Sequence, residues 1–443
     1  MTAPLPASPP NFVNEDDDEL RRRVMRRVAW RLIPFLGLLY VFNIIDRANL
    51  GFVKDALQAD LGMSPDVFSL GYGLFYFGYL LFEVPSNLLL RNVGARRWIA
   101  RIMISWGIVS AGTLLVTGTT SFYLVRILLG VAEAGFFPGI ILYLTYWFPA
   151  RERAKVVSLF MMAIAVANIF GNPLSGAIMH LMGGVSDLKG WQWLFLLEGL
   201  PSVLLGFAVL FCLTDRPSEA RWLTPEERDW LVNRMQKEEQ RRREIHGADR
   251  LAAMFNGRVW LLICLYFTVA VGTNAGSAHF PSLLQKQYQD LNKLELGFLL
   301  ALPHIAALIG MTLLSIHSDR TGERRGHVAF AALVAAAGWA LAATASSPLL
   351  TLVGFCLAQM GMMSMLPVFW AIPTAFLSGV AAAGGVALIN SVANIGGILG
   401  ASILNQFGLW SMAGILLLGA GLAMFVRPET RAMKQQAEEV DRE

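Results

Sequence analysis

Four charged side chains stand out in this chain because they lie inside apolar segments. Asp46 and Arg47 are adjacent in the first such segment, and Arg126 and Glu133 lie seven residues apart in another. A spacing of seven puts two helical side chains on one face, about two turns or ~10 Å apart. In lipid, such a charge costs roughly 2.5–3.5 kcal/mol, so these residues are candidates for function.

The residue types indicate the chemistry. Arginine keeps its charge, and its planar guanidinium group binds a carboxylate through two parallel hydrogen bonds. A carboxylate, in contrast, can bind and release a proton. We therefore expect Arg47 and Arg126 to bind an anion, and Asp46 and Glu133 to carry protons. The alternative is an intramembrane ion-pair network that only holds helices together.

The composition is that of a membrane protein. Of 443 residues, 55% are hydrophobic and 15% are charged, and the mean hydropathy is +0.52, whereas about a quarter of a soluble domain is charged. Apart from Arg47 and Arg126, most arginines lie at the edges of apolar segments rather than along one face, which argues against nucleic-acid binding. The three cysteines, each alone in an apolar segment, form neither a metal motif nor a disulfide pattern.

The apolar segments are long enough to cross a bilayer, which takes about 20 residues. Six precede a charged stretch and six follow it, so we expect twelve transmembrane helices in an all-α membrane protein built from two pseudo-symmetric six-helix bundles. The expected spans are 29–50, 67–90, 97–118, 121–148, 156–181, 192–214, 258–281, 295–317, 327–346, 349–377, 384–404 and 407–426. The expected domains are a tail at 1–27, bundles at 28–214 and 258–426, a linker at 215–257 and a second tail at 427–443.

Charge and turn signals orient these elements. Arginine and lysine concentrate before the first span, in alternate loops and in the linker, which predicts that both termini are cytoplasmic. Thr224 and Pro225 form a helix start signal within the linker. Segments 84–98 and 315–327 both end in or near Gly-x-Arg-Arg, and this weak repeat favours two homologous halves with a binding site between them.

Longer motifs carry a family resemblance. The segments FEVPSNLLLRNVGARRWIARIMISWG, RILLGVAEAGFFPGIILYLTYWFPARERA, GWQWLFLLEGLP and SDRTGERRGHV resemble the major facilitator superfamily, in its anion:cation symporter branch and tartrate transporter-like subgroup, with galactonate and phthalate permeases as relatives. The resemblance covers about residues 27–427. It implies the major facilitator fold, proton roles for Asp46 and Glu133, and two charged cytoplasmic gating loops. The expected gating residues are Glu83, Arg91, Arg97, Asp319, Arg320 and Arg324; ordinary positive-inside charge is the alternative reading of the arginines.

The second half contrasts with the first, because no Asp or Glu lies in the interior of its predicted spans. We therefore expect proton coupling in the first half and neutral substrate contacts from the second. Asn390 and Asn394 stack one turn apart, and the resemblance favours them together with Trp370. His279 and His304 stand where such carriers usually have aromatic residues. The expected substrate-binding residues are Arg47, Tyr79, Arg126, His279, Trp370, Asn390 and Asn394. For the polar residues of the second half an interhelical hydrogen bond is the alternative, and for Tyr79 the alternative is aromatic packing.

Together these observations predict a secondary active transporter in a bacterial inner membrane. It would take up a small organic anion, such as tartrate, a sugar acid or an aromatic carboxylate, together with protons, as a monomer in the lipid bilayer. A nucleotide loop, a metal-ligand cluster and a nucleophile triad are missing from the sequence, so we expect no enzyme activity, cofactor or metal. The alternatives are a transporter-like anion sensor and an efflux carrier, although two buried arginines would repel cationic drugs. The connection within 401–410 is shorter than the family pattern, so the last hairpin is expected to be altered.

Overall fold

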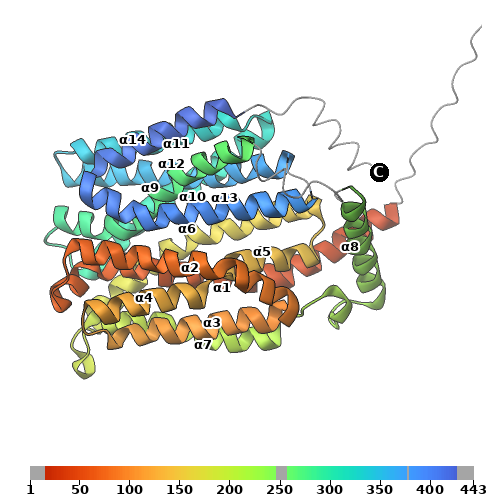
Figure 1. Cartoon of the computed structure of the whole chain (residues 1–443), viewed down its shortest axis with the longest axis horizontal. Helices are drawn as coiled ribbons and strands as arrows, with labels where there is room; N and C mark the ends of the chain where they lie inside the picture. The colour runs from red at the N-terminus through yellow and green to blue at the C-terminus, as the bar shows by residue number, and fades with distance from the viewer. Residues whose placement is uncertain (1–14, 246–256, 377–378, 427–443) are drawn as a thin grey trace, which may run out of the picture.

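The computed structural model describes residues 15–245, 257–376 and 379–426, and the regular elements of this part are all helices. Ten helices are long and apolar enough to span a membrane. Helix α2 and the shorter α14 lie beside them, and α4 and α5 together make one span, which gives the twelve predicted membrane helices. Figure 1 shows them side by side as two groups, α1–α7 and α9–α14.

Each half contains six spans. The first half consists of α1 (Glu15–Leu61), α2 (Pro65–Val93), α3 (Ala95–Gly112), η1 (Thr113–Leu115), α4 (Thr119–Glu133), α5 (Phe136–Trp147), α6 (Ala150–Leu181), η2 (Val185–Asp187) and α7 (Gly190–Cys212). The second consists of α9 (Gly257–Gln287), α10 (Lys293–Thr321), α11 (Arg325–Thr344), α12 (Pro348–Phe376), α13 (Gly379–Phe407) and α14 (Leu409–Phe425). Between them lie η3 (Pro217–Glu219) and α8 (Pro225–Ile245).

The linker helix α8 lies across one end of the bundle, next to the start of α1 (Figure 1). We call this end the linker face and the opposite end the far face. The predicted helix start is confirmed, because Thr224 Oγ1 accepts a hydrogen bond from the backbone N–H of Glu227 at 3.3 Å. The Glu227 carboxylate in turn accepts one from Arg27 at 2.6 Å. Since α1 begins at Glu15, part of the segment expected as a tail is helical.

The span expected at 121–148 is interrupted. Its two helices, α4 and α5, meet at Ala134 and Gly135, and Gly135 is left-handed with a φ of 86°, a conformation that favours glycine. A Cβ atom there would also overlap the Ser86 side chain, which donates a hydrogen bond to the Ala134 carbonyl at 2.7 Å. The break places Glu133 at the end of α4, where its side chain is fully buried.

The two halves meet through close helix contacts between α1 and α9, α2 and α13, and α6 and α10. Glycines allow these contacts in the part of the interface toward the far face. A Cβ atom at Gly51 would overlap the Ser277 carbonyl, and one at Gly297 would overlap the Asn172 carbonyl. Ser282 also donates a hydrogen bond to Asp55 at 2.9 Å across α9 and α1. Backbone therefore packs directly on backbone between the halves there.

The final hairpin is as short as the sequence indicates. Helix α13 ends at Phe407 and α14 begins at Leu409, so Gly408 alone connects them. Its φ of 70° lies in the left-handed region, and its N–H donates to the Leu404 carbonyl at 3.0 Å. A left-handed glycine thus ends one helix and starts the next.

Candidate functional site

The structure brings the four intramembrane charges together around one small cavity. The lining comes from three helices of the first half: α1, α2 and α4. The lining residues are Asp46, Arg47, Tyr72, Phe75, Tyr76, Arg126, Leu129 and Glu133. Their proximity matches the expectation from spacing, while their roles remain predictions.

Glu133 is the most enclosed of these charges. One carboxylate oxygen, Oε1, forms an ion pair with Arg47 and accepts a hydrogen bond from Asn43 Nδ2 at 2.6 Å. The other oxygen, Oε2, is buried and has no hydrogen-bond partner among the described residues. A buried carboxylate with one oxygen bonded and one unbonded has a ready position for a proton.

Asp46 lies in a different environment, directed toward α3. Trp106 Nε1 donates to its Oδ2 at 2.9 Å, and Ser110 Oγ donates to its Oδ1. These donors are neutral, and in the described part of the chain no arginine or lysine forms an ion pair with Asp46. The two acids next to one cavity are therefore held differently, one by a cation and one by neutral hydrogen bonds.

The two arginines also differ, because Arg47 is paired with a carboxylate and, in the described part of the chain, Arg126 is not. Among the described residues it forms no ion pair, and its Nε donates to the Gly71 carbonyl at a long 3.4 Å. Its guanidinium carbon lies 4.9 Å from the centroid of the Phe75 ring, and that of Arg47 lies 5.2 Å from the same centroid. Phe75 thus supports both guanidinium groups through cation–π contacts, and Arg126 retains donors for an anion.

The predicted ligands Tyr79, Asn390 and Asn394 lie along α2 and α13. The Tyr79 ring centroid is 5.1 Å from the Arg47 guanidinium carbon. One turn further along α2, Glu83 is buried and accepts hydrogen bonds from Asn390 at 2.9 Å, Ser391 at 3.3 Å and Asn394 at 3.3 Å. The two predicted substrate contacts therefore bind a residue expected in a gate.

The arginines grouped with Glu83 by sequence lie elsewhere or are not described. Arg97 is exposed, and the side chain of Arg91 lies outside the described residues. Arg96 instead meets Asp215, which accepts a hydrogen bond from the Arg96 backbone N–H at 2.7 Å. The Glu83 carboxylate thus faces the second half of the molecule.

The predicted ligands His279 and Trp370 do not line the cavity in this structure. His279 is buried in α9, with Nδ1 3.3 Å from the Ala275 carbonyl oxygen and Nε2 without a partner among the described residues. The Trp370 ring packs edge-on against Tyr266, with centroids 5.0 Å apart. The other histidine, His304, has its Nδ1 atom 3.4 Å from Nε2 of Gln359. Their contact with substrate remains a prediction.

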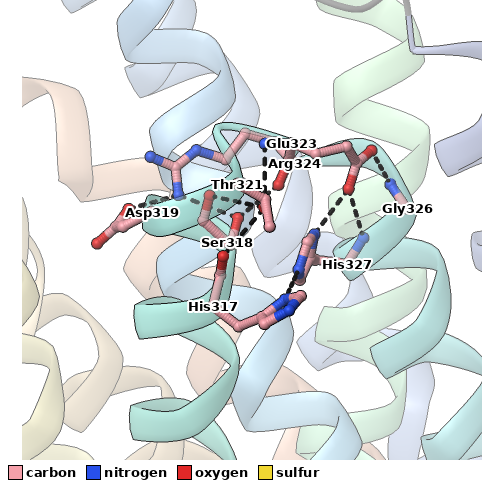
Figure 2. A network of polar contacts seen from close by, with 8 residues as sticks. All are labelled: His317, Ser318, Asp319, Thr321, Glu323, Arg324, Gly326 and His327. Carbon is pink, nitrogen blue, oxygen red and sulfur yellow. Dashed lines mark hydrogen bonds and ion pairs between the residues drawn. The ribbon is translucent and has the colours of Figure 1, made fainter.

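The second predicted gate contains the expected charge pair. Arg324 Nη1 lies 2.6 Å from Asp319 Oδ1 and also donates to Ser318 Oγ at 3.0 Å (Figure 2). Ser318 donates in turn to the Glu323 carbonyl at 2.7 Å. Arg320 is exposed. Asp319 and Arg324 thereby join the end of α10 to the turn before α11.

Sequence reasoning missed a chain of titratable groups beside this pair. His327 Nδ1 lies 2.7 Å from Glu323 Oε2, and its Nε2 lies 2.7 Å from His317 Nδ1 (Figure 2). Burial raises the pKa of the Glu323 carboxyl group, but hydrogen bonds from the Gly326 and His327 N–H groups outweigh it and leave that pKa below its usual value. This network closes the turn between α10 and α11.

Two contributors to the central site were also missed, Asn43 and Phe75. Asn43 lies four residues before Arg47 on α1, a spacing that puts both on one face and would have identified it. Phe75 had no comparable signal, since one phenylalanine among 27 looks like packing. Its contacts with both arginines depend on how α2 is rotated.

A fold of two helical bundles, with arginines and carboxylates at one cavity among the membrane-spanning helices, is typical of a membrane transporter. The Major Facilitator Superfamily model matches residues 36–401. The chain belongs to this superfamily and, by its curated relatives, to the tartrate transporter-like subgroup.

Individual relatives agree with this assignment. A protein of Agrobacterium vitis named "Putative tartrate transporter" is 48% identical over 418 residues, 92% of each chain. A quinolone resistance transporter of Acinetobacter baumannii is 37% identical over 94% of this chain and 98% of its own. The crystal structure of a D-xylose-proton symporter has a TM-score of 0.72 at 17% identity, covering 91% of this chain and 98% of the other; at that identity it supports the fold alone.

Proposed function

We propose that this protein takes up a small organic anion together with protons by alternating access in a bacterial inner membrane. The linker face and both termini would be cytoplasmic. The observation that carries the proposal is the cavity in which Arg47 and Arg126 lie beside Asp46 and Glu133. It combines fixed positive charges for an anion with groups that exchange protons.

Anion binding and protonation would be coupled through Arg47. In this structure Arg47 is paired with Glu133, whereas Arg126 has no acidic partner among the described residues. A substrate carboxylate that binds both guanidinium groups would compete with Glu133 for Arg47. A buried carboxylate that loses its cation is costly, so substrate binding would favour protonated Glu133, and by linkage protonation would strengthen anion binding.

The substrate class follows from the arginines and is supported by the relatives. Two guanidinium groups at one cavity suit a carboxylate, and the relative from Agrobacterium vitis is named for tartrate. We therefore propose tartrate, a sugar acid or an aromatic carboxylate. Contacts across the interface toward the far face, such as Ser282 to Asp55, indicate a state closed on that side, which would be the periplasmic side.

One reconstituted sample tests the coupling through Glu133→Gln. This variant mimics the protonated carboxyl group, so it should still exchange tartrate in a counterflow assay but lose accumulation driven by a pH gradient. The matched control is Glu152→Gln, because Glu152 pairs with Arg21 outside the cavity. A Glu133→Gln protein that still concentrates tartrate on a pH gradient would remove Glu133 from the mechanism.

Two other functions remain as outcomes of the same assays. The quinolone resistance relative favours an efflux carrier as the second candidate, which would be identified by quinolone extrusion without anion counterflow. A transporter-like sensor would bind the anion and show neither counterflow nor accumulation.

A further inference from the structure

Glu83 presents a buried carboxylate to the second half of the molecule. It is 4% exposed, and in the described part of the chain no arginine, lysine or histidine forms an ion pair with it. Its hydrogen bonds come from three neutral side chains of α13: Asn390 to Oε1, and Ser391 and Asn394 to Oε2. We call these three residues the amide cradle.

The cradle is built for a carboxylate. Two amide nitrogens and one hydroxyl donate to both oxygens of a single group. A carboxylate accepts at both oxygens, whereas a hydroxyl group has one oxygen only. A buried carboxylate without a cation is expensive unless such bonds satisfy it, so the cradle's affinity for this group explains why Glu83 can be buried there.

The cradle also lies close to the cavity. Tyr72, Tyr76, Tyr79 and Glu83 follow one another at helical spacing along one face of α2. Glu83 is one turn, or about 6 Å of helix rise, beyond Tyr79, whose ring faces the Arg47 guanidinium group. An anion held by Arg47 thus has the cradle as a neighbouring group of donors on the opposite half.

We infer that Glu83 is an internal competitor that occupies, in the empty carrier, a subsite for a second carboxylate of the substrate. The inference rests on the proposed function and narrows its substrate class to dicarboxylates. One carboxylate binds Arg47 and Arg126, and the other displaces Glu83 from Asn390, Ser391 and Asn394. Displacement breaks the hydrogen bonds between Glu83 and α13. A dicarboxylate therefore loosens α2 from α13, whereas a monocarboxylate leaves these hydrogen bonds in place.

The first test asks whether the cradle binds a free carboxylate, without reference to the transported substrate. Glu83→Ala empties the cradle. Sodium formate should then raise the Tm of the purified Glu83→Ala protein more than sodium chloride of equal ionic strength. The wild-type protein and the triple variant Glu83→Ala, Asn390→Ala, Asn394→Ala should show a smaller difference, because only the arginines of the cavity are open to formate in them. Equal effects of formate and chloride on Glu83→Ala would overturn the inference.

The second test uses Glu83→Gln, which keeps the shape of the side chain and guards against misfolding of the alanine variant. Tartrate is compared with threonate, in which a CH₂OH group replaces one carboxylate. A weakened competitor should lower the Kd for tartrate several-fold and leave the Kd for threonate within about twofold. The control is Asp66→Asn, because Asp66 accepts a hydrogen bond from Asn405 at 2.9 Å across the same two helices.

The outcomes separate the two proposals. If the wild-type protein binds neither acid, the proposed function fails, while the formate experiment still decides whether the cradle recognises a carboxylate. If the wild-type protein binds tartrate and Glu83→Gln leaves that Kd unchanged, the inference about Glu83 fails alone.

Discussion

The two arginines of the cavity are not equivalent, because Arg47 is paired with Glu133 while Arg126 has no acidic partner among the described residues. An entering carboxylate loses hydration that only charged donors replace well. Arg126 can bind it without breaking an existing ion pair. We therefore regard Arg126 as the first contact and Arg47 as the residue that transmits binding to Glu133.

Substitution of either arginine is expected to weaken binding by more than about tenfold. Arg47→Ala and Arg126→Ala remove a charge, and Arg126→Lys keeps the charge but loses the planar pair of donors. The measurement is the shift in Tm on adding tartrate to the purified protein. Near-normal stabilisation of Arg126→Ala would contradict the assignment.

The two histidines of the second half are expected to affect specificity and not proton coupling. Neither lines the cavity, and we propose that the carboxylates there carry the protons. His279→Phe and His304→Tyr should both accumulate substrate on a pH gradient, with an altered preference among organic acids. Complete loss of pH-driven uptake in either variant would show that the proton route includes a histidine.

At the scale of elements, the buried Glu227 carboxylate of α8 forms ion pairs with two arginines of α1, Arg23 and Arg27. Burial raises the pKa of Glu227, but the hydrogen bond from the Thr224 N–H and the charges of Arg27 and Arg23 outweigh it, so the pKa is lowered overall. A lowered pKa means that these ion pairs are fully present above the ordinary value of 4.5 and weaken as the pH falls through the folded-state pKa.

The corresponding experiment follows hydrogen exchange of α8 at several pH values. Wild-type α8 should be protected near neutral pH and lose protection in acid, below about pH 4.5. Glu227→Gln should exchange faster at neutral pH and show little further change in acid. A matched control is Glu226→Gln. Glu226 also lies near an arginine of α1, 3.6 Å from Arg23, but unlike Glu227 it is exposed. Equal protection of wild-type and Glu227→Gln α8 at neutral pH would contradict this role.

The contact between α1 and α9 should control which state the carrier prefers. A Cβ atom at Gly51 would overlap the Ser277 carbonyl, so Gly51→Ala disfavours the packing seen here and shifts the population toward a state open at the far face. Gly37→Ala is the control on the same helix, because nothing lies within 4 Å of its added Cβ.

Thiol labelling can measure this shift. Ser282→Cys, placed at the interface toward the far face in a background without the three native cysteines, should react faster in Gly51→Ala than in Gly37→Ala. Equal labelling rates would show that this contact does not set the equilibrium.

Much of this element-scale organisation could be predicted from the sequence, because hydropathy reports directly which segments enter lipid. Hydropathy does not predict that α1 extends back to Glu15, because that part of the helix is charged. It also missed the break at Gly135, which lies inside a continuous apolar run. The four charges of the cavity were predictable because ionisable groups are costly in lipid.

The pairing of Glu83 with α13 was not predictable. Which side chains meet across the two halves depends on the rotation of each helix about its axis and on the state of the carrier, and neither is encoded in local hydropathy. Sequence therefore identified Glu83, Asn390 and Asn394 separately but grouped Glu83 with arginines. The structure shows that they contact one another.

At the scale of the whole molecule, the two halves share a fold but differ in charge. Asp46, Arg47, Arg126 and Glu133 all belong to the first half. In the described spans of the second half, Asp, Glu, Lys and Arg occur only within a few residues of helix ends, as with Lys293 and Glu295 at the start of α10. One half therefore holds the arginines and carboxylates of the cavity, and the other supplies neutral donors.

This separation of charge has an electrical consequence. Moving one elementary charge across the membrane involves about 2.3 kcal/mol per 100 mV of membrane potential. In the described spans of the second half the interior carries no Asp, Glu, Lys or Arg. Apart from its histidines, the second half would therefore do almost no electrical work as it rocks in the proposed cycle. The voltage would therefore act on the proposed cycle through the first half and its cargo. An empty carrier and a loaded one would respond to the same voltage differently, according to how many protons accompany each anion.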